Sequence, residues 1–228
     1  MNILVIVAHP DDPEFFAGAS IAHWVKRGHT VRYVIVTGGD KGSDAPDMTP
    51  QKLKAMRVIE QREAAAALGV TDIAFWDYID GELANDLLLR RDIAREIRRS
   101  KPDIVVTTDP QTLHHGSRGI NHNDHRMIGM AVCDAIFPAS NNRMYFPELL
   151  GAGFEMHYPK EIYFAGPTAP NFWVEVSAEI ETKAAAIRQH VSQVKDPSGI
   201  EARMRANTFR LLADGRVEYR EAFRRVML

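Results

Sequence analysis

The sequence predicts an α/β protein with a Rossmann-like, largely parallel sheet flanked by helices on both faces. Continuous apolar, β-branched runs, of the kind that form strands buried on both faces, recur along the first half of the chain. Segments with the features of helices alternate with these runs, as in doubly wound sheets. At 228 residues the chain has the size of one domain, which we take to be residues 1–228.

The first half of the chain carries this alternation most clearly. We expect strands at 2–8, 31–37, 71–78 and 104–108, and helices at 15–27, 49–68 and 86–100. Gly28 and Gly69 end the first two helices, because glycine is common just after the last helical residue. Thr49-Pro50 opens the second helix, since proline fits the first helical position.

The pattern is less regular after residue 108. We expect a polar loop at 109–121, a helix at 122–137, strands at 161–166 and 172–176, helices at 178–194 and 199–213, and a last edge strand at 220–227. The segment 138–160 contains prolines and glycines and reads as irregular. We expect a homo-oligomer, with this segment as an interface between subunits or as a lid.

The composition is that of an ordinary globular protein and excludes several classes. A net charge near −2 implies no broad basic face, so we expect no nucleic-acid partner. The single cysteine, Cys133, rules out an intrachain disulfide and a multi-cysteine metal site. The N-terminus lacks the basic region of a signal peptide, and no run approaches the ~20 apolar residues of a membrane span. We therefore expect a cytoplasmic protein without a membrane span.

The first chemical motif, Ala8-His9-Pro10-Asp11-Asp12, directly follows the first strand. Ligands bind outside the carboxyl ends of the strands in open α/β sheets, so the histidine and the carboxylates can converge there. His9 and Asp12 can face the same way across the turn that Pro10 stiffens, and a cation would relieve the repulsion between the two carboxylates. The alternative is that one aspartate only caps the next helix and that His9 is a buried core histidine.

The second motif, His122-Asn123-Asp124-His125, stands at the expected start of a helix after strand 104–108. Residues three apart on a helix share a face, so His122 and His125 can point into one cleft. The alternative is a solvated helix start in which Asp124 interacts with the helix dipole. Both motifs follow buried strands, which favours a common site.

Two histidines and one carboxylate are a frequent catalytic zinc set that leaves one position for water. Zinc lowers the pKa of such a water from 15.7 to about 7. Fe²⁺ or another divalent ion suits the same donors. The two motifs contain further acidic and histidine side chains. Those that do not bind the ion themselves are candidates to orient the side chains that bind it.

At this point the sequence resembles the LmbE-like, or PIG-L-type, family of zinc-dependent N-acetylglucosaminyl deacetylases. The resemblance covers most of the chain in order. The matching segments are Ala8–Asp12 with Glu14, Arg57-x-x-Glu60 followed by Ala64 and Leu68-Gly69, Asp80-Gly81, His122-x-Asp124-His125, and Lys183 with His190-x-Ser192-Gln193. The first and fourth of these together are the specific ones. Position 123 is Asn where relatives often have Pro, which changes no candidate ligand atom.

The resemblance implies hydrolysis of an N-acetyl group from a glucosamine unit of a small-molecule substrate. The implied roles are metal ligand for His9, Asp12 and His125, general base for Asp11, stabilisation of the oxyanion for His122, orientation of His122 for Asp124, and binding of sugar hydroxyls for Arg57 and Asp80. We also expect Asp124 to favour a protonated His122, which would then donate a proton to the amine.

Other segments carry weaker signals. The GGDKG loop at 38–42 lacks the spacing of a phosphate-binding loop and reads as a tight turn bordering the substrate. His114 and His115, with Arg118, read as exposed loop residues rather than as a lid or ligands. His190 reads as a core histidine or as a group behind the metal ligands. The arginines of helix 86–100 read as a solvated face, namely Arg90, Arg91, Arg95, Arg98 and Arg99.

Two other functions are compatible with these residues. A metal-dependent phosphoesterase also uses aspartates at strand ends, but it usually needs more bridging carboxylates than these motifs supply. A sugar- or nucleotide-binding regulator would carry a structural ion or none, and a structural zinc site is closed by four protein ligands. The motifs supply three clear ligands, which favours catalysis.

Overall fold

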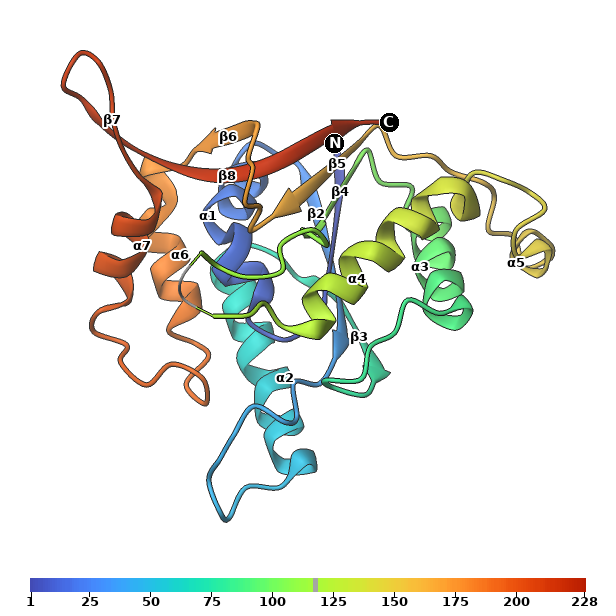
Figure 1. The fold of residues 1–228 in the computed structure, drawn as a ribbon, viewed down its shortest axis with the longest axis horizontal. Coiled ribbons are helices and arrows are strands. Elements are labelled where there is room, and N and C mark those ends of the chain that lie inside the picture. Colours follow the sequence, from blue (N-terminus) through green and yellow to red (C-terminus); the bar gives the residue numbers. More distant parts are fainter. Residues whose placement is uncertain (117–118) are drawn as a thin grey trace.

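The computed structural model describes residues 1–116 and 119–228. Its strands are β1 (Asn2–Val7), β2 (Thr30–Thr37), β3 (Asp72–Tyr78), β4 (Ile104–Thr108), β5 (Glu161–Ala165), β6 (Phe172–Glu175), β7 (Phe209–Leu211) and β8 (Val217–Met227). They form one sheet in the order β3-β2-β1-β4-β5-β8-β6, with β7 paired to β8 (Figure 1). Neighbouring strands from β3 to β5 are parallel, whereas β8 is antiparallel to its partners. The α/β, largely parallel fold is therefore confirmed.

The helices begin and end close to the predicted positions in the first half of the chain. They are α1 (Asp12–Lys26), α2 (Pro50–Ala67), α3 (Leu87–Ser100), α4 (Asn123–Asp134), α5 (Pro147–Gly151), α6 (Ile180–Ile187) and α7 (Ile200–Thr208). The Thr49 hydroxyl caps α2 by accepting the N–H of Lys52, and Asp86 caps α3 in the same way through Leu89. Such caps satisfy N–H groups that have no partner within the helix.

Helices cover both faces of the sheet, which explains why β1 is apolar and buried at every position after Asn2. Ile3, Val5 and Val7 belong to the core beneath α1, α2, α6 and α7. Leu4 and Ile6 belong to the core beneath α3 and α4 on the opposite face. Alternate side chains of a strand point to opposite faces, so a strand buried on both sides needs an unbroken apolar run.

The C-terminal region differs from the prediction. The helix predicted at 199–213 ends at Thr208, because the chain then turns around Asp214-Gly215 to form the β7–β8 hairpin. The predicted edge strand at 220–227 lies within the sheet, between β5 and β6. The Asp-Gly pair is a common hairpin signal, and it marks this turn in the sequence.

The segment 138–160 lies at the amino ends of the strands, away from the end where ligands bind in such sheets. Arg98 organises it, since its buried guanidinium donates to the carbonyl oxygens of Ala139, Ser140, Asn142 and Tyr145. Arg98 is therefore not part of a solvated face. The prediction that 138–160 forms a lid is wrong, because the segment lies at the end of the sheet opposite the candidate site (Figure 1). Its role as a subunit interface stays a prediction.

The strand order reverses direction next to β1, with β2 on one side and β4 on the other. The loops after β1 and β4 therefore diverge from neighbouring strand ends and leave a crevice between them, where open α/β sheets bind ligands. Both sequence motifs lie in these loops or directly after them. No helix within 1–116 or 119–228 combines the length and apolarity that a bilayer span needs.

Candidate metal centre

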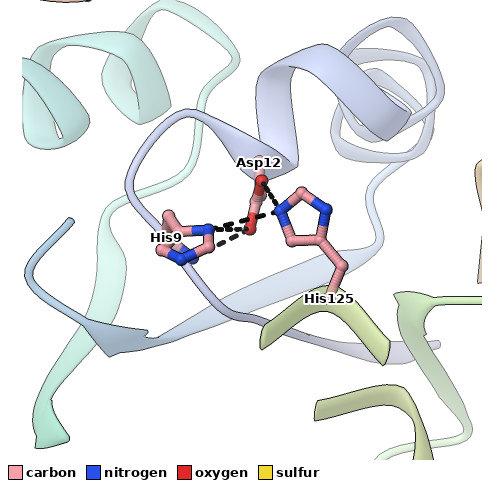
Figure 2. A group of neighbouring side chains, drawn as sticks. All are labelled: His9, Asp12 and His125. Carbon is pink, nitrogen blue, oxygen red and sulfur yellow. Dashed lines mark hydrogen bonds and ion pairs between the residues drawn. The ribbon is translucent and has the colours of Figure 1, made fainter. Parts of the chain in front are cut away.

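The side chains of His9, Asp12 and His125 converge outside the carboxyl ends of β1 and β4 (Figure 2). His9 Nδ1 lies 3.3 Å from His125 Nε2 and 3.5 Å from Asp12 Oδ2, and His125 Nε2 lies 3.0 Å from Asp12 Oδ1. Four ligands at ~2.1 Å in a tetrahedron are separated by ~3.4 Å, so these spacings suit a zinc-sized ion. The donor set fits a divalent cation.

Asn121 fixes the orientation of His125. Its Oδ1 atom accepts the Nδ1–H of His125 at 2.9 Å, which leaves His125 Nε2 with a free lone pair toward His9 and Asp12. The amide of Asn121 is itself held by the carbonyl oxygen of Thr112 at 2.7 Å. Asn121 is not among the residues predicted for the site, although its position four residues before a candidate histidine ligand is a usable signal.

Two buried carboxylates, those of Asp80 and Asp124, bond to the second nitrogen of the His9 ring. His9 Nε2 lies 3.1 Å from Asp80 Oδ1 and 3.3 Å from Asp124 Oδ2. Burial alone lowers the pKa of His9, but the bonds and charges of Asp12, Asp124 and Asp80 raise it well above its ordinary value. A histidine whose second nitrogen donates to carboxylates is the usual arrangement behind a metal ligand.

The expected contact between Asp124 and His122 differs from the contact in the structure. The Asp124 carboxylate bonds to His9 and accepts the N–H groups of Gly81 (2.7 Å) and Leu83 (3.2 Å). His122 meets only the backbone of Asp124, whose N–H donates to His122 Nδ1 at 3.2 Å. The geometry therefore associates Asp124 with His9 rather than with His122.

The surroundings of His122 favour the neutral ring over the protonated one. Burial lowers its pKa, the nearby charge of His9 lowers it further, and Asp124 raises it only in part. With Nδ1 accepting a hydrogen bond, the proton of the neutral ring is on Nε2. His122 lines the same cleft as His9 and His125 and can donate a hydrogen bond there.

Asp11 lies beside the cluster in a strained backbone conformation. Its φ is 90°, in the left-handed region that non-glycine residues avoid. It occupies the position before α1, yet its side chain makes no capping bond. Arg57 holds its carboxylate instead, at 3.1 Å. Burial raises the pKa of Asp11 to about 6, although Arg57 lowers it and Asp12 raises it again.

Arg57 and Asp80 reach the cleft, but protein groups already engage them. Arg57 donates to the carbonyl oxygens of Gly39 (2.8 Å) and Pro10, so it joins the two strand-end loops. A Cβ atom on Gly39, whose φ is 60°, would lie 2.2 Å from the Arg57 guanidinium. Asp80 bonds to His9 through Oδ1 and to the N–H of Lys41 through Oδ2.

The cleft around these residues has a volume of about 340 Å³ and a polar, charged lining. Lys41 and Gly42 of the GGDKG loop border it, as predicted for a turn next to the substrate. A second cluster that could hold an ion, His9 with His122 and Asp124, shares His9 with the first. His114 and His115 are exposed, as expected, and Arg118 lies outside the described residues.

The fold and the donor set together give a candidate divalent-metal site on a Rossmann-like sheet. The chain belongs to the PIG-L (GlcNAc-PI de-N-acetylase) family, which matches residues 4–136 and confirms the resemblance. It is 31% identical over 192 residues to diacetylchitobiose deacetylase from Thermococcus kodakarensis, which covers 84% of this chain and 70% of that protein.

Solved structures agree with this assignment. N,N'-diacetylchitobiose deacetylase from Pyrococcus horikoshii, solved with its inhibitor MPG, has a TM-score of 0.87 and 28% identity, covering 99% of this chain and 84% of that one. GalB, the 4-carboxy-2-hydroxymuconate hydratase from Pseudomonas putida KT2440, has a TM-score of 0.79 at 21% identity, with 100% and 96% covered. The second likeness concerns the fold alone, so function must be argued from the site.

Proposed function

We propose that this protein is a zinc-dependent N-deacetylase that hydrolyses the acetamide of an N-acetylglucosamine unit in a small-molecule amino-sugar substrate. One observation carries the proposal: His9, Asp12 and His125 offer ligand atoms within 4.8 Å of one another, beside Asp11 and His122 in one cleft. The similarity to two diacetylchitobiose deacetylases supports a substrate with N-acetylglucosamine units.

His9 through Nδ1, Asp12 and His125 through Nε2 are the residues that would hold the ion. When bound, zinc supplies Lewis acidity, which lowers the pKa of water and polarises the amide carbonyl. Asp80 and Asp124 hold the Nε2–H of His9, and Asn121 holds the Nδ1–H of His125. Both imidazoles are therefore held with one ring nitrogen, His9 Nδ1 and His125 Nε2, directed toward the ion.

Asp11 acts as the general base. Its carboxylate takes a proton from the attacking water as the water oxygen bonds to the acetamide carbon. Burial raises the pKa of this carboxyl, and the Arg57 charge keeps it from rising further, so the group is basic enough to accept the proton and still ionised at neutral pH. As the C–N bond breaks, Asp11 returns the proton to the amine, leaving acetate and the free amino sugar.

His122 stabilises the oxyanion that develops on the carbonyl oxygen. A neutral ring with the proton on Nε2 can donate one hydrogen bond into the cleft. We therefore assign the return of the proton to Asp11 rather than to His122. Arg57 and Asp80 act chiefly by positioning Asp11 and His9. Lys41 also lines the cleft, and its ammonium is paired with Glu82 at 2.8 Å.

Acetate release tests this function. The purified protein should release acetate from N,N'-diacetylchitobiose or N-acetylglucosamine, lose the activity after treatment with a chelator, and regain it with Zn²⁺ or, anaerobically, with Fe²⁺. Acetate release that chelation does not change would contradict the metal-dependent mechanism. Release of phosphate from phosphate esters, without acetate release, would support the phosphoesterase alternative instead, and metal binding without any turnover would support a binding protein.

A further inference from the structure

We propose that Gln61 is a positioning residue for Asp11, and that a buried chain of hydrogen bonds through Glu14 to His190 fixes Gln61 in the orientation that this requires. The inference rests on the proposed function, because it concerns the placement of the general base. It also gives a physical role to His190-x-Ser192, which the deacetylase mechanism leaves unused.

The chain of bonds starts at the backbone of Asp11, whose N–H donates to Gln61 Oε1 at 2.7 Å. Gln61 Nε2 donates to the two Glu14 oxygens at 3.0 and 3.1 Å. Glu14 Oε2 in turn accepts from His190 Nε2 at 3.1 Å. Gln61, Glu14 and His190 are each 0% exposed, so solvent does not compete for these bonds.

Asp11 needs this support because its backbone is strained. A non-glycine residue at φ 90° persists only where its surroundings hold it. Gln61 fixes the N–H of Asp11, and Arg57 fixes the carboxylate and the carbonyl oxygen of Pro10. Without Gln61, the Asp11 N–H would lose its acceptor and the backbone would relax toward an ordinary conformation, which would move the carboxylate.

Glu14 decides which way the Gln61 amide faces. A glutamine side chain can present either its oxygen or its nitrogen to a neighbour, and here both Glu14 oxygens lie within hydrogen-bond distance of the Gln61 nitrogen, with His190 Nε2 also donating to Glu14. Glu14 therefore binds the amide nitrogen of Gln61 and leaves the amide oxygen for Asp11. His190 completes the set as a donor through Nε2, and its Nδ1 has no partner within the part of the chain that is described.

The turn after α6 is hydrogen-bonded to α2, the helix that carries Gln61, and this holds His190 close to Glu14. Ser192 donates to both Glu60 oxygens, through its N–H at 2.8 Å and through its hydroxyl at 2.7 Å. Glu60 directly precedes Gln61 in α2. The segment that carries His190 and Ser192 is thus bonded to α2 at Glu60, directly before the residue that contacts Asp11.

The test compares Gln61→Met with the wild-type protein loaded with zinc. Methionine keeps the length and approximate volume but makes neither hydrogen bond. We expect kcat to fall by about 10²-fold, the scale of a displaced reacting group, with KM within about twofold and zinc content unchanged. Ile21→Val is the matched control, because it removes one methylene from a fully buried residue of α1 that forms none of these side-chain hydrogen bonds. If Gln61→Met keeps the wild-type kcat, or if Ile21→Val reduces kcat equally, the proposal is wrong.

A reciprocal exchange gives a readout that a merely structural role would not move. In Glu14→Gln the amide of residue 14 offers a donor to Gln61 and the fixed orientation is lost, so kcat should fall. In the double variant Glu14→Gln/Gln61→Glu, the amide of residue 14 donates to the carboxylate of residue 61, which still accepts the Asp11 N–H. The double variant should recover most of the kcat lost in Glu14→Gln. A double variant no more active than Glu14→Gln would overturn the proposal.

Hydrogen exchange of the Asp11 amide separates this proposal from the proposed function. Faster exchange at Asp11 in Gln61→Met, measured by NMR on the zinc-loaded protein, supports the bond to Gln61 whether or not acetate is released. Wild-type protein that exchanges slowly at Asp11 but releases no acetate would reject the function and keep the positioning role. Unchanged exchange in Gln61→Met would reject the positioning role.

Discussion

The Asp124 carboxylate lies 3.3 Å from His9 Nε2, although 115 residues separate the two in the chain. Asp124 is fully buried, and its two oxygens also accept the N–H groups of Gly81 and Leu83. The second motif therefore supplies both a candidate ligand, His125, and the carboxylate that orients the ligand of the first motif. This links ion binding to the way the two strand-end loops meet.

Asp124→Asn should weaken zinc binding by about 10- to 100-fold, as is usual when the partner of a metal-binding histidine is changed. The amide keeps the shape of the carboxylate but lacks the negative charge that attracts the Nε2–H of His9. Competition with a chromophoric chelator measures the dissociation constant. Asp92→Asn is the control, because Asp92 pairs with Tyr78 and Arg95 away from the cleft. Equal affinity in Asp124→Asn and wild type would contradict this role.

Asp11→Asn should separate turnover from ion binding. Loss of a general base costs about 10²- to 10⁴-fold in rate, and Asp11 is not among the three clustered ligands. We expect acetate release to fall by that factor while zinc content, measured by atomic emission, stays near one ion per chain. His125→Ala should lose both. An Asp11→Asn protein with near-normal kcat would show that another group takes the proton.

The positions of the candidate ligands were predictable because they depend on local sequence and on sheet topology. The apolar run at 104–108 forms the strand with the predicted bounds, and the motifs at His9 and His125 follow adjacent parallel strands. Strand order 2-1-4 brings those ends together, as expected for a doubly wound sheet. The hairpin at Asp214-Gly215 also carried a local signal, but its strand pairs within the sheet, which local sequence does not specify.

The partners of the ligands were less predictable because their contacts depend on side-chain packing between distant segments. Asp80 and Asp124 both point at His9, whereas the family resemblance implied a sugar hydroxyl as the partner of Asp80 and His122 as the partner of Asp124. Gln61 reaches Asp11 from a different helix. Neither helical spacing nor motif position identifies such contacts, since both describe only neighbours along one element.

Zinc binding should release about one proton at neutral pH. Burial lowers the pKa of His9 in the metal-free protein, but three carboxylates raise it well above its ordinary value, so the ring is charged and an ion must displace the proton on Nδ1. Below this pKa the apparent affinity should fall about tenfold for each unit that the pH is lowered. Calorimetry in buffers of different ionisation enthalpy counts the released protons.

His9 also determines how the stability of the metal-free protein changes with pH. A histidine whose pKa is raised on folding stabilises the metal-free fold below its unfolded pKa, and this contribution is lost as the pH rises through the folded value. The free energy of unfolding of the metal-free protein should therefore decline as the pH rises through the pKa of His9, while zinc-loaded protein should not show this decline. Zinc binding without proton release at pH 7 would contradict both expectations.

Lys183→Met should destabilise the protein by about 3–5 kcal/mol, the usual cost of removing one partner of a buried ion pair. Lys183 Nζ lies 2.6 Å from Glu221 Oε1 with both side chains 3% exposed, and Glu221 also accepts the N–H groups of Ala19 and Ser20 in α1. Lys183→Met leaves that carboxylate buried without its cation. Urea unfolding of the zinc-loaded protein measures the effect, with the exposed Lys195→Met as a control expected within about 0.5 kcal/mol of wild type.

Adding Glu221→Gln to Lys183→Met should recover part of the loss, because a neutral amide removes the uncompensated charge and can still accept a backbone N–H. A double variant less stable than Lys183→Met would mean that Glu221 stabilises α1 chiefly through its charge on the helix N–H groups rather than through Lys183.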